Sequence, residues 1–342
     1  MQYLVYTHLT PDTAILSDTY LQRTILYNAI GLGLLLLCIF GNYMYLAKGA
    51  WILLAIFLLG LLPPWFFGFY GRQYTLCYYL ALVYPLVYAL LLYRLRDKGA
   101  KAIWFLHGLT LLFLVRMLFG TIITWSTVLA AGCLTLLLLC LAIHRGILTG
   151  SSKRTLWLLT VLPYVAAAAC FVILFFQNSY MRDRLTEFLK GSGYVQQMLA
   201  LEQQQMLAFG GGTISSYVDT ESLASTYVLH SIFLWFGIVS GILVIVALAV
   251  LVLRSLHYAL HQSNRLALLA GTAASGILLF ELLHFVLTNL GCSPVYTASV
   301  PFLSYGFANS VFNSLLVGIT LGVIRNQNVL SETTASLRGL RA

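Results

Sequence analysis

Charged residues are scarce in this sequence of 342 residues. Only 8% of the residues are Asp, Glu, Lys or Arg, and just ten of them are acidic. A soluble globular domain carries about 25% charged residues, so this composition excludes a soluble enzyme or binding domain. The hydrophobic share of 60% instead predicts an all-α polytopic membrane protein, since helices satisfy their own backbone within a bilayer.

Metal-binding and redox motifs are missing as well. The six cysteines form neither a C-x-x-C pair nor any other spacing typical of metal ligands. The formal net charge of +9 comes from basic residues scattered over loops that flank apolar segments, where membrane topology and anionic lipids explain them. We therefore expect no metal site, no tightly bound cofactor and no nucleic-acid partner.

Apolar segments of about 20 residues, the length that crosses a bilayer, recur along the chain. We predict nine spans, at 26–47, 51–69, 75–93, 102–120, 121–143, 155–176, 226–253, 266–290 and 302–324. The stretch 102–143 is too long for one span and is expected to turn near Gly120. The predicted organisation is a short polar N-terminal segment (1–25), a single transmembrane domain (26–325) and a short cytoplasmic tail (326–342).

Basic residues predict the orientation of these spans, because loops rich in Lys and Arg stay on the cytoplasmic side. One set of alternating loops holds most of them, namely Lys48, Arg94, Arg96, Lys98, Lys101, Arg145, Lys153, Arg154, Arg254, Arg265, Arg325, Arg338 and Arg341. This set is expected to be cytoplasmic, which places the C-terminus inside and the long segment 177–225 outside.

The external segment 177–225 concentrates the groups that chemistry at the membrane surface needs. It holds five of the ten acids, together with two arginines, namely Asp183, Glu187, Glu202, Asp219, Glu221, Arg182 and Arg184. From Tyr194 to Phe209 apolar residues recur at helical spacing, which predicts an amphipathic helix at the membrane surface. The alternative is a plain interfacial helix and loop without chemistry.

Ionisable residues inside the predicted spans mark a second region. Glu281 lies in the span 266–290 with His284 three residues on, so both face one side of that helix. A carboxylate in a bilayer is costly and indicates an interior site, with Arg116 as its candidate partner. The alternative is a structural polar contact between helices. His230, near the outer end of the span 226–253, is predicted to be interfacial.

Two prolines interrupt the apolar sequence near its C-terminal end. Pro294 and Pro301 lie in the segment Ser-Pro-Val-Tyr-Thr-Ala-Ser-Val-Pro-Phe-Leu-Ser-Tyr-Gly, residues 293–306. Proline lacks the backbone donor that a helix needs. Non-helical backbone at membrane depth persists only where it is buried in protein or lines a polar cavity. The segment is therefore predicted to belong to a site.

This segment resembles the signature of the SEDS family (shape, elongation, division and sporulation). The matching positions are Pro294, Pro301, Phe302, Ser304, Tyr305 and Gly306. The sequence departs from the family pattern at Tyr296, Thr297, Ser299, Phe307, Ala308 and Asn309. The external segment extends the resemblance with Tyr180, Arg182, Arg184, Phe188, Gly193, Tyr194 and the run from Gln204 to Gly212. The matches follow the family order over most of residues 180–325.

The resemblance implies about ten spans and a role in bacterial cell-wall synthesis during division, elongation or sporulation. It implies a peptidoglycan glycosyltransferase of the plasma membrane that polymerises lipid II, an undecaprenyl-diphosphate-linked disaccharide, beside a class B penicillin-binding transpeptidase. Mg²⁺ or Mn²⁺ is expected to accompany the diphosphate. Arginine suits a diphosphate because its planar guanidinium binds phosphate oxygens bidentately. The expected substrate contacts are Arg182, Arg184, Ser304, Tyr305, Glu281 and Arg116.

The family carries an essential aspartate in a Thr-Asp-Phe motif, and here that position falls on Thr226. A neutral threonine is no base at neutral pH. Asp219 and Glu221, a few residues earlier, are the candidate catalytic acids. Whether the chain is an enzyme therefore stays open. The alternatives are a catalytically degenerate SEDS-like scaffold or regulator of wall synthesis, and a lipid-linked glycan flippase. An O-antigen-type polymerase or ligase is disfavoured by the Pro-Phe-Leu-Ser-Tyr-Gly segment.

Overall fold

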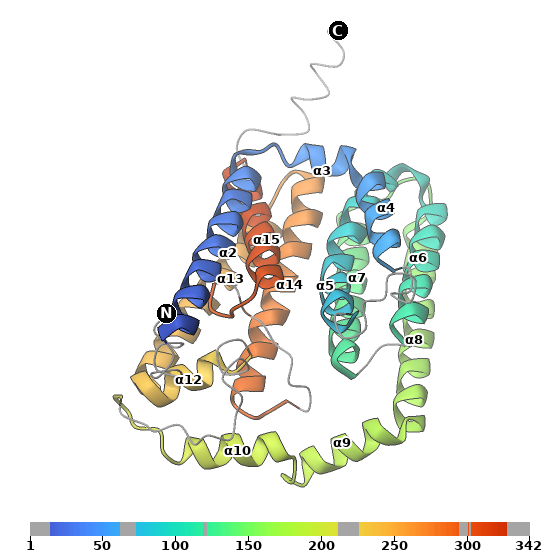
Figure 1. The fold of residues 1–342 in the computed structure, drawn as a ribbon. Coiled ribbons are helices and arrows are strands. Elements are labelled where there is room, and N and C mark those ends of the chain that lie inside the picture. The colour runs from blue at the N-terminus through green and yellow to red at the C-terminus, as the bar shows by residue number, and fades with distance from the viewer. Residues whose placement is uncertain are drawn as a thin grey trace. The chain divides into compact units, whose positions relative to one another are not determined.

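The computed structural model describes residues 14–61, 73–118, 122–210, 226–293, 300 and 302–326. Within these ranges every regular element is a helix (Figure 1). Six of the helices are long and apolar enough to cross a membrane, and the described residues hold three shorter apolar helices besides. The prediction of an all-α polytopic membrane protein is confirmed.

The helices follow the predicted spans closely in most of the chain. In order they are α2 (Ala14–Phe40), α3 (Met44–Lys48), α4 (Ala50–Leu61), α5 (Gln73–Arg94), the 3-10 turn η2 (Arg96–Lys98), α6 (Ala100–Leu118), α7 (Ile122–His144), α8 (Lys153–Gln177), α9 (Ser179–Leu189), α10 (Tyr194–Gln203), α12 (Val228–Phe236), α13 (Ile238–Leu260), α14 (Arg265–Asn289) and α15 (Phe307–Arg325). The stretch 102–143 divides between α6 and α7 as predicted. By contrast, α2 begins inside the segment expected to precede the first span and ends at Phe40, so the single span predicted at 26–47 divides between α2 and α3.

The predicted continuous span over 226–253 is wrong, because the chain breaks at Gly237 between α12 and α13. Gly237 has φ 87° and ψ 165°, a conformation that only glycine adopts readily. A Cβ atom there would lie 2.5 Å from the carbonyl oxygen of Ala208. The backbone after α10 packs against this break, since the amide of Ile238 donates to the carbonyl of Leu207 at 3.0 Å.

The chain divides into two compact units. The first comprises Met1–Leu37, Asn178–Arg254 and Leu278–Gly318, and the second comprises Cys38–Gln177, Ser255–Ile277 and Ile319–Ala342. Boundaries fall inside α2, α13, α14 and α15, so each of these four helices contributes residues to both units.

The core of the second unit forms around α5. The Tyr84 ring of α5 stacks on Phe113 of α6 with centroids 4.3 Å apart, and Phe57 of α4 lies 5.5 Å from the same tyrosine. The Tyr84 hydroxyl hydrogen-bonds Thr110 at 2.6 Å, so this buried aromatic group is satisfied. Pro85 lies inside α5 and Pro163 inside α8 without ending either helix.

Arginines cap helix ends in the second unit. Arg145 donates to the carbonyl of Leu260, the last residue of α13, at 3.1 Å. Arg325 donates to the carbonyl of Ile39, in the last turn of α2, at 2.9 Å. Cations at helix C-termini satisfy free carbonyls and complement the helix dipole. Both arginines belong to the loops predicted to be cytoplasmic, and the orientation itself stays a prediction.

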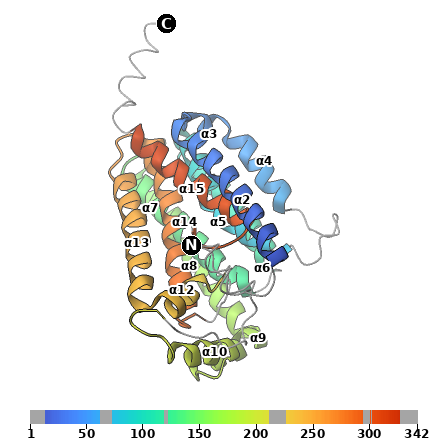
Figure 2. The same ribbon diagram turned by 60° about the vertical axis from the view of Figure 1, so that its left-hand side comes forward.

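In the first unit, α2 packs closely on the start of α15. The Tyr27 ring lies 5.4 Å from Phe307 and 6.0 Å from Tyr305, centroid to centroid. One turn further along, a Cβ atom on Gly31 would lie 2.7 Å from Ser314 Oγ, so the two helices approach closely here. The successive helices α9 and α10 carry the external segment and are yellow-green in Figures 1 and 2.

Candidate functional site

A buried acid and a buried histidine meet in the first unit. Glu202 on α10 has 1% of its side chain exposed, and His230 on α12 has 0%. The distance between Glu202 Oε2 and His230 Nε2 is 2.7 Å. His230, which was predicted to be interfacial, is fully buried. Its burial is tolerated because Glu202 supplies a hydrogen-bond partner for the ring.

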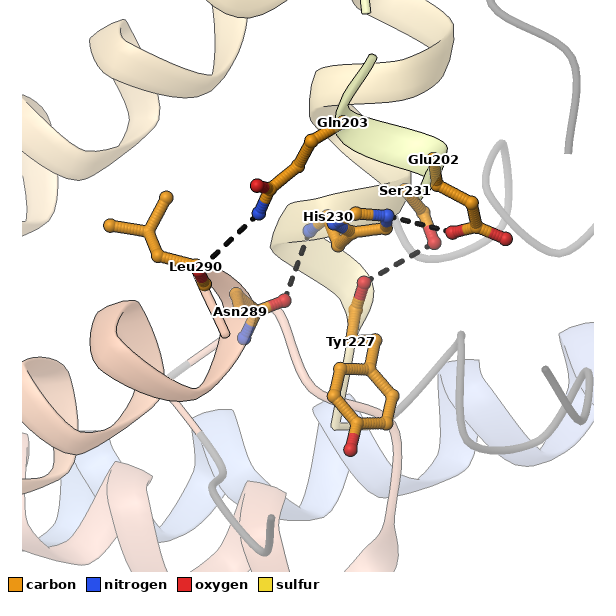
Figure 3. A network of polar contacts seen from close by, with 7 residues as sticks. All are labelled: Glu202, Gln203, Tyr227, His230, Ser231, Asn289 and Leu290. Atoms are coloured by element: carbon orange, nitrogen blue, oxygen red, sulfur yellow. Dashed lines mark hydrogen bonds and ion pairs between the residues drawn. The ribbon is translucent and has the colours of Figure 1, made fainter. Parts of the chain in front are cut away.

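Asn289 joins this pair to a third helix, as Figure 3 shows. Its Oδ1 accepts the backbone N–H of His230 at 2.9 Å. Its Nδ2 donates to the carbonyl of Thr226 at 3.0 Å and to that of Phe285 at 2.8 Å. One buried amide thus fixes the start of α12 against the end of α14.

Local packing brings the carboxylate of Glu202 inward. Met198 and Leu199 are buried on the same face of α10, and Glu202 follows them at the i+4 and i+3 positions. Gln203 Nε2 then donates to the carbonyl of Leu290 at 3.3 Å, which ties the end of α10 to the turn after α14. The predicted helix within 194–209 forms, but its acid lies on the apolar face.

This inward acid is the signal that sequence reasoning missed. The spacing Met198, Leu199, Glu202 already places the carboxylate with the buried residues, yet we grouped Glu202 with the external acids. Removing the partner of a buried charge usually costs about 3–5 kcal/mol, and such pairs contribute little net stability themselves. The buried pair is therefore a candidate functional site and not a main source of stability.

The proline-containing segment is non-helical at the residues described, as predicted. Phe302 has φ 66°, an uncommon conformation for a residue with a side chain, and is about half exposed. Ser304 is buried, and its Oγ accepts the N–H of Val300 at 3.1 Å. Asn309 donates to the carbonyls of Ser304 at 2.7 Å and of Val300 at 3.3 Å. These bonds hold the backbone in place of a helix, so α15 starts only at Phe307.

Ser304 and Tyr305, two of the predicted substrate contacts, thus lie side by side in this turn. The Ser304 hydroxyl is engaged with the local backbone, whereas the Tyr305 ring is half-buried against Tyr27 of α2. Pro294 and Pro301 lie outside the described residues. The structure assigns Ser304 a role in shaping the segment, and its predicted role as a substrate contact stays a prediction.

Glu281 is buried on α14, with 1% of its surface exposed, and His284 is buried on the same helix. The His284 ring stacks on Phe280 with centroids 5.5 Å apart. An acid thus lies inside a helix with the length and hydropathy of a membrane span, as the sequence indicated. The backbone of Arg116 lies in α6, and its side chain is outside the described part of the structure, so its pairing with Glu281 stays a prediction.

The two arginines of the external segment lie on α9. Arg182 is exposed, and Arg184 is half-buried with Nη1 3.2 Å from the Tyr180 hydroxyl. Residues two apart do not share a helix face, so α9 does not bring the two guanidinium groups together. A diphosphate held by both would have to reach around the helix.

The predicted catalytic acids Asp219 and Glu221 lie outside the described residues. Thr226, at the position where the resemblance expects an acid, is described. It is half-buried, and its carbonyl accepts the Asn289 amide. The same Asn289 amide also holds the backbone of His230, whose ring pairs with Glu202.

The described residues contain no group of three or more His, Cys, Asp or Glu side chains arranged to hold a metal ion. A divalent cation bound with a lipid diphosphate would arrive as part of the substrate. Its involvement stays a prediction.

No family model matches the sequence, and no curated protein matches it. The structure does match a chain from a peptidoglycan synthase complex studied for the structural coordination of polymerization and crosslinking. The TM-score is 0.64 at 19% identity, and the match covers 96% of this chain and 95% of that chain. At this identity the likeness establishes a shared fold over nearly the whole chain.

Proposed function

We propose that the chain is a SEDS-like protein of the bacterial plasma membrane that polymerises lipid II during peptidoglycan synthesis. The observation that carries the proposal is the fold, which follows a chain of a peptidoglycan synthase complex over 96% of this sequence. The Pro-Phe-Leu-Ser-Tyr-Gly segment at 301–306 and the arginine-bearing external segment support it independently.

The reaction joins two lipid-linked sugars. The acceptor hydroxyl loses a proton and attacks the anomeric carbon of the donor, whose bond to the diphosphate breaks. The reaction needs a base to accept the proton and a positive charge to stabilise the departing diphosphate. Arg182, exposed on α9, suits the second task. Two sets of residues are candidates for the first, namely Asp219 and Glu221 from the sequence and Glu202 with His230 from the structure.

The proposed partner is a class B penicillin-binding transpeptidase. The structural neighbour belongs to a complex that couples polymerization to crosslinking. A chain with the same fold is suited to the same division of labour, in which this protein makes the strand and its partner crosslinks it.

A second candidate function is a scaffold or regulator that binds the wall-synthesis machinery without catalysis. The observation in its favour is Thr226, which puts a neutral residue where the resemblance expects the catalytic acid. A flippase is a further alternative, because the break at Gly237 between α12 and α13 and the buried Glu281 also suit transport.

One assay separates these functions. The purified protein in liposomes is given labelled lipid II with Mg²⁺ or Mn²⁺, with and without the transpeptidase. We expect glycan ladders. Bound lipid II with no ladder under any condition would contradict the proposal and favour the regulator. Lipid II that crosses the vesicle membrane without polymerising would favour the flippase.

A further inference from the structure

The hydrogen bond between Glu202 and His230 orients the imidazole. The ionised carboxylate only accepts hydrogen bonds, so its 2.7 Å contact with Nε2 places the ring proton on that nitrogen. In the neutral ring the lone pair is then on Nδ1. A carboxylate on one side thus prepares the other nitrogen to accept a proton.

His230 Nδ1 is buried and has no hydrogen-bond partner in the part of the chain that the structure describes. A buried polar atom without a partner costs stability, and such atoms in native proteins call for an explanation. A hydroxyl group of a bound sugar is a donor of the kind that Nδ1 lacks.

The ring is also fixed in position. The His230 backbone N–H is held by Asn289, and the same amide holds the carbonyl of Thr226 one helical turn earlier. His230 therefore lies in the first turn of α12, close in sequence to Thr226, the position where the resemblance expects an acid. Because both side chains are buried, bulk water does not compete for the ring, and an acceptor hydroxyl reaches Nδ1 only when the packing around the ring opens.

We propose that His230, paired with Glu202, is the general base that activates the acceptor sugar. The acceptor O–H proton passes to Nδ1, the oxygen forms a bond to the anomeric carbon of the donor, and the diphosphate leaves with the electron pair of the broken C–O bond. Glu202 stabilises the imidazolium that results and is a positioning residue. The inference rests on the proposed function and is an alternative to Asp219 and Glu221 as the source of the base.

The test compares matched variants in the lipid II polymerisation assay. His230→Gln keeps a polar side chain of similar size without a basic nitrogen, and Glu202→Gln keeps an acceptor for Nε2–H without the charge. We expect His230→Gln to lower kcat by about 100-fold or more with lipid II binding retained. Glu202→Gln should lower kcat by about tenfold with KM unchanged. Gln197→Ala, on the exposed face of α10, should change neither.

A merely structural role would reduce the yield of folded protein and leave kcat per folded molecule unchanged. Folded His230→Gln that polymerises within threefold of wild type would overturn the inference. If that variant does not fold, Glu202→Gln at the wild-type rate would overturn it equally. So would a loss of polymerisation, with binding intact, in Asp219→Asn or Glu221→Gln. Wild-type protein that makes no glycan would instead refute the proposed function.

Discussion

Gly237→Ala is the substitution whose cost the structure defines most directly. The residue has φ 87° and ψ 165°, and a Cβ would lie 2.5 Å from Ala208 O, 2.6 Å from Gly210 N and 2.7 Å from the Phe209 Cα atom. The backbone conformation alone costs alanine about 1–3 kcal/mol. The neighbouring atoms belong to the backbone, so relieving the overlap means separating residues 208–210 from the break between α12 and α13.

We therefore expect Gly237→Ala to lower the stability of the first unit by roughly 3 kcal/mol, at the upper end of ordinary substitutions. In a thermal unfolding experiment in detergent this corresponds to a fall in Tm of roughly 5–10 °C. The matched control is Gly33→Ala on α2, where a Cβ would meet nothing within 4 Å. This variant should be at least as stable as wild type, because alanine favours a helix. Equal Tm values for the two variants would refute the reasoning.

Three further predictions, two of them with a matched control variant, test other parts of the molecule. Asn289→Ala leaves the His230 amide and the Thr226 carbonyl without their partner, and should cost about 3 kcal/mol by thermal unfolding. The control is Gln203→Ala, which loses one hydrogen bond of 3.3 Å at a half-exposed residue and should cost less than about 1 kcal/mol. Similar losses of stability in Asn289→Ala and Gln203→Ala would contradict the network assigned to Asn289. Asn309→Ala removes the hydrogen bonds to the carbonyls of Val300 and Ser304. The rate of amide hydrogen exchange across 302–306 should therefore rise at least tenfold. An unchanged exchange rate would show that the segment keeps its conformation without Asn309. Arg182→Gln removes the exposed guanidinium of α9 and should weaken binding of the lipid diphosphate, measured as retention of labelled lipid II. Lys190→Gln, which removes an exposed cation after α9, should leave binding intact. Wild-type retention by Arg182→Gln would exclude this arginine as a diphosphate contact.

The fold class could be predicted from hydropathy because an apolar segment that crosses a bilayer must be about 20 residues long and must form a helix to pair its backbone groups. The division of 102–143 and the span at 266–290 were therefore predicted well. The break at Gly237 was not, because the sequence 226–253 is mostly apolar and gives no sign of the contacts that the break makes. The carbonyls of Leu207 and Ala208 accept hydrogen bonds from the amides that follow Gly237. These two residues lie about 30 positions earlier in the sequence, so the contact cannot be seen in the sequence of the span.

The site was predicted in part. Glu281 was found because a carboxylate in a span is conspicuous, and the segment at 302–306 was found because of its prolines. The Glu202–His230 pair escaped because its members lie 28 residues apart on different helices. Each alone has an ordinary explanation at a membrane surface. Asn289, which joins the pair to α14, was missed because a single amide near the end of a span carries no sequence signal.

The most direct test of the account is glycan synthesis by the purified wild-type protein. Labelled lipid II in liposomes, with Mg²⁺ or Mn²⁺ and with the transpeptidase added, should yield ladders of polymerised glycan. We expect these ladders from the wild-type protein and their loss in His230→Gln. Lipid II that binds but remains unpolymerised by wild-type protein under every condition would contradict the claim that the chain is a peptidoglycan polymerase.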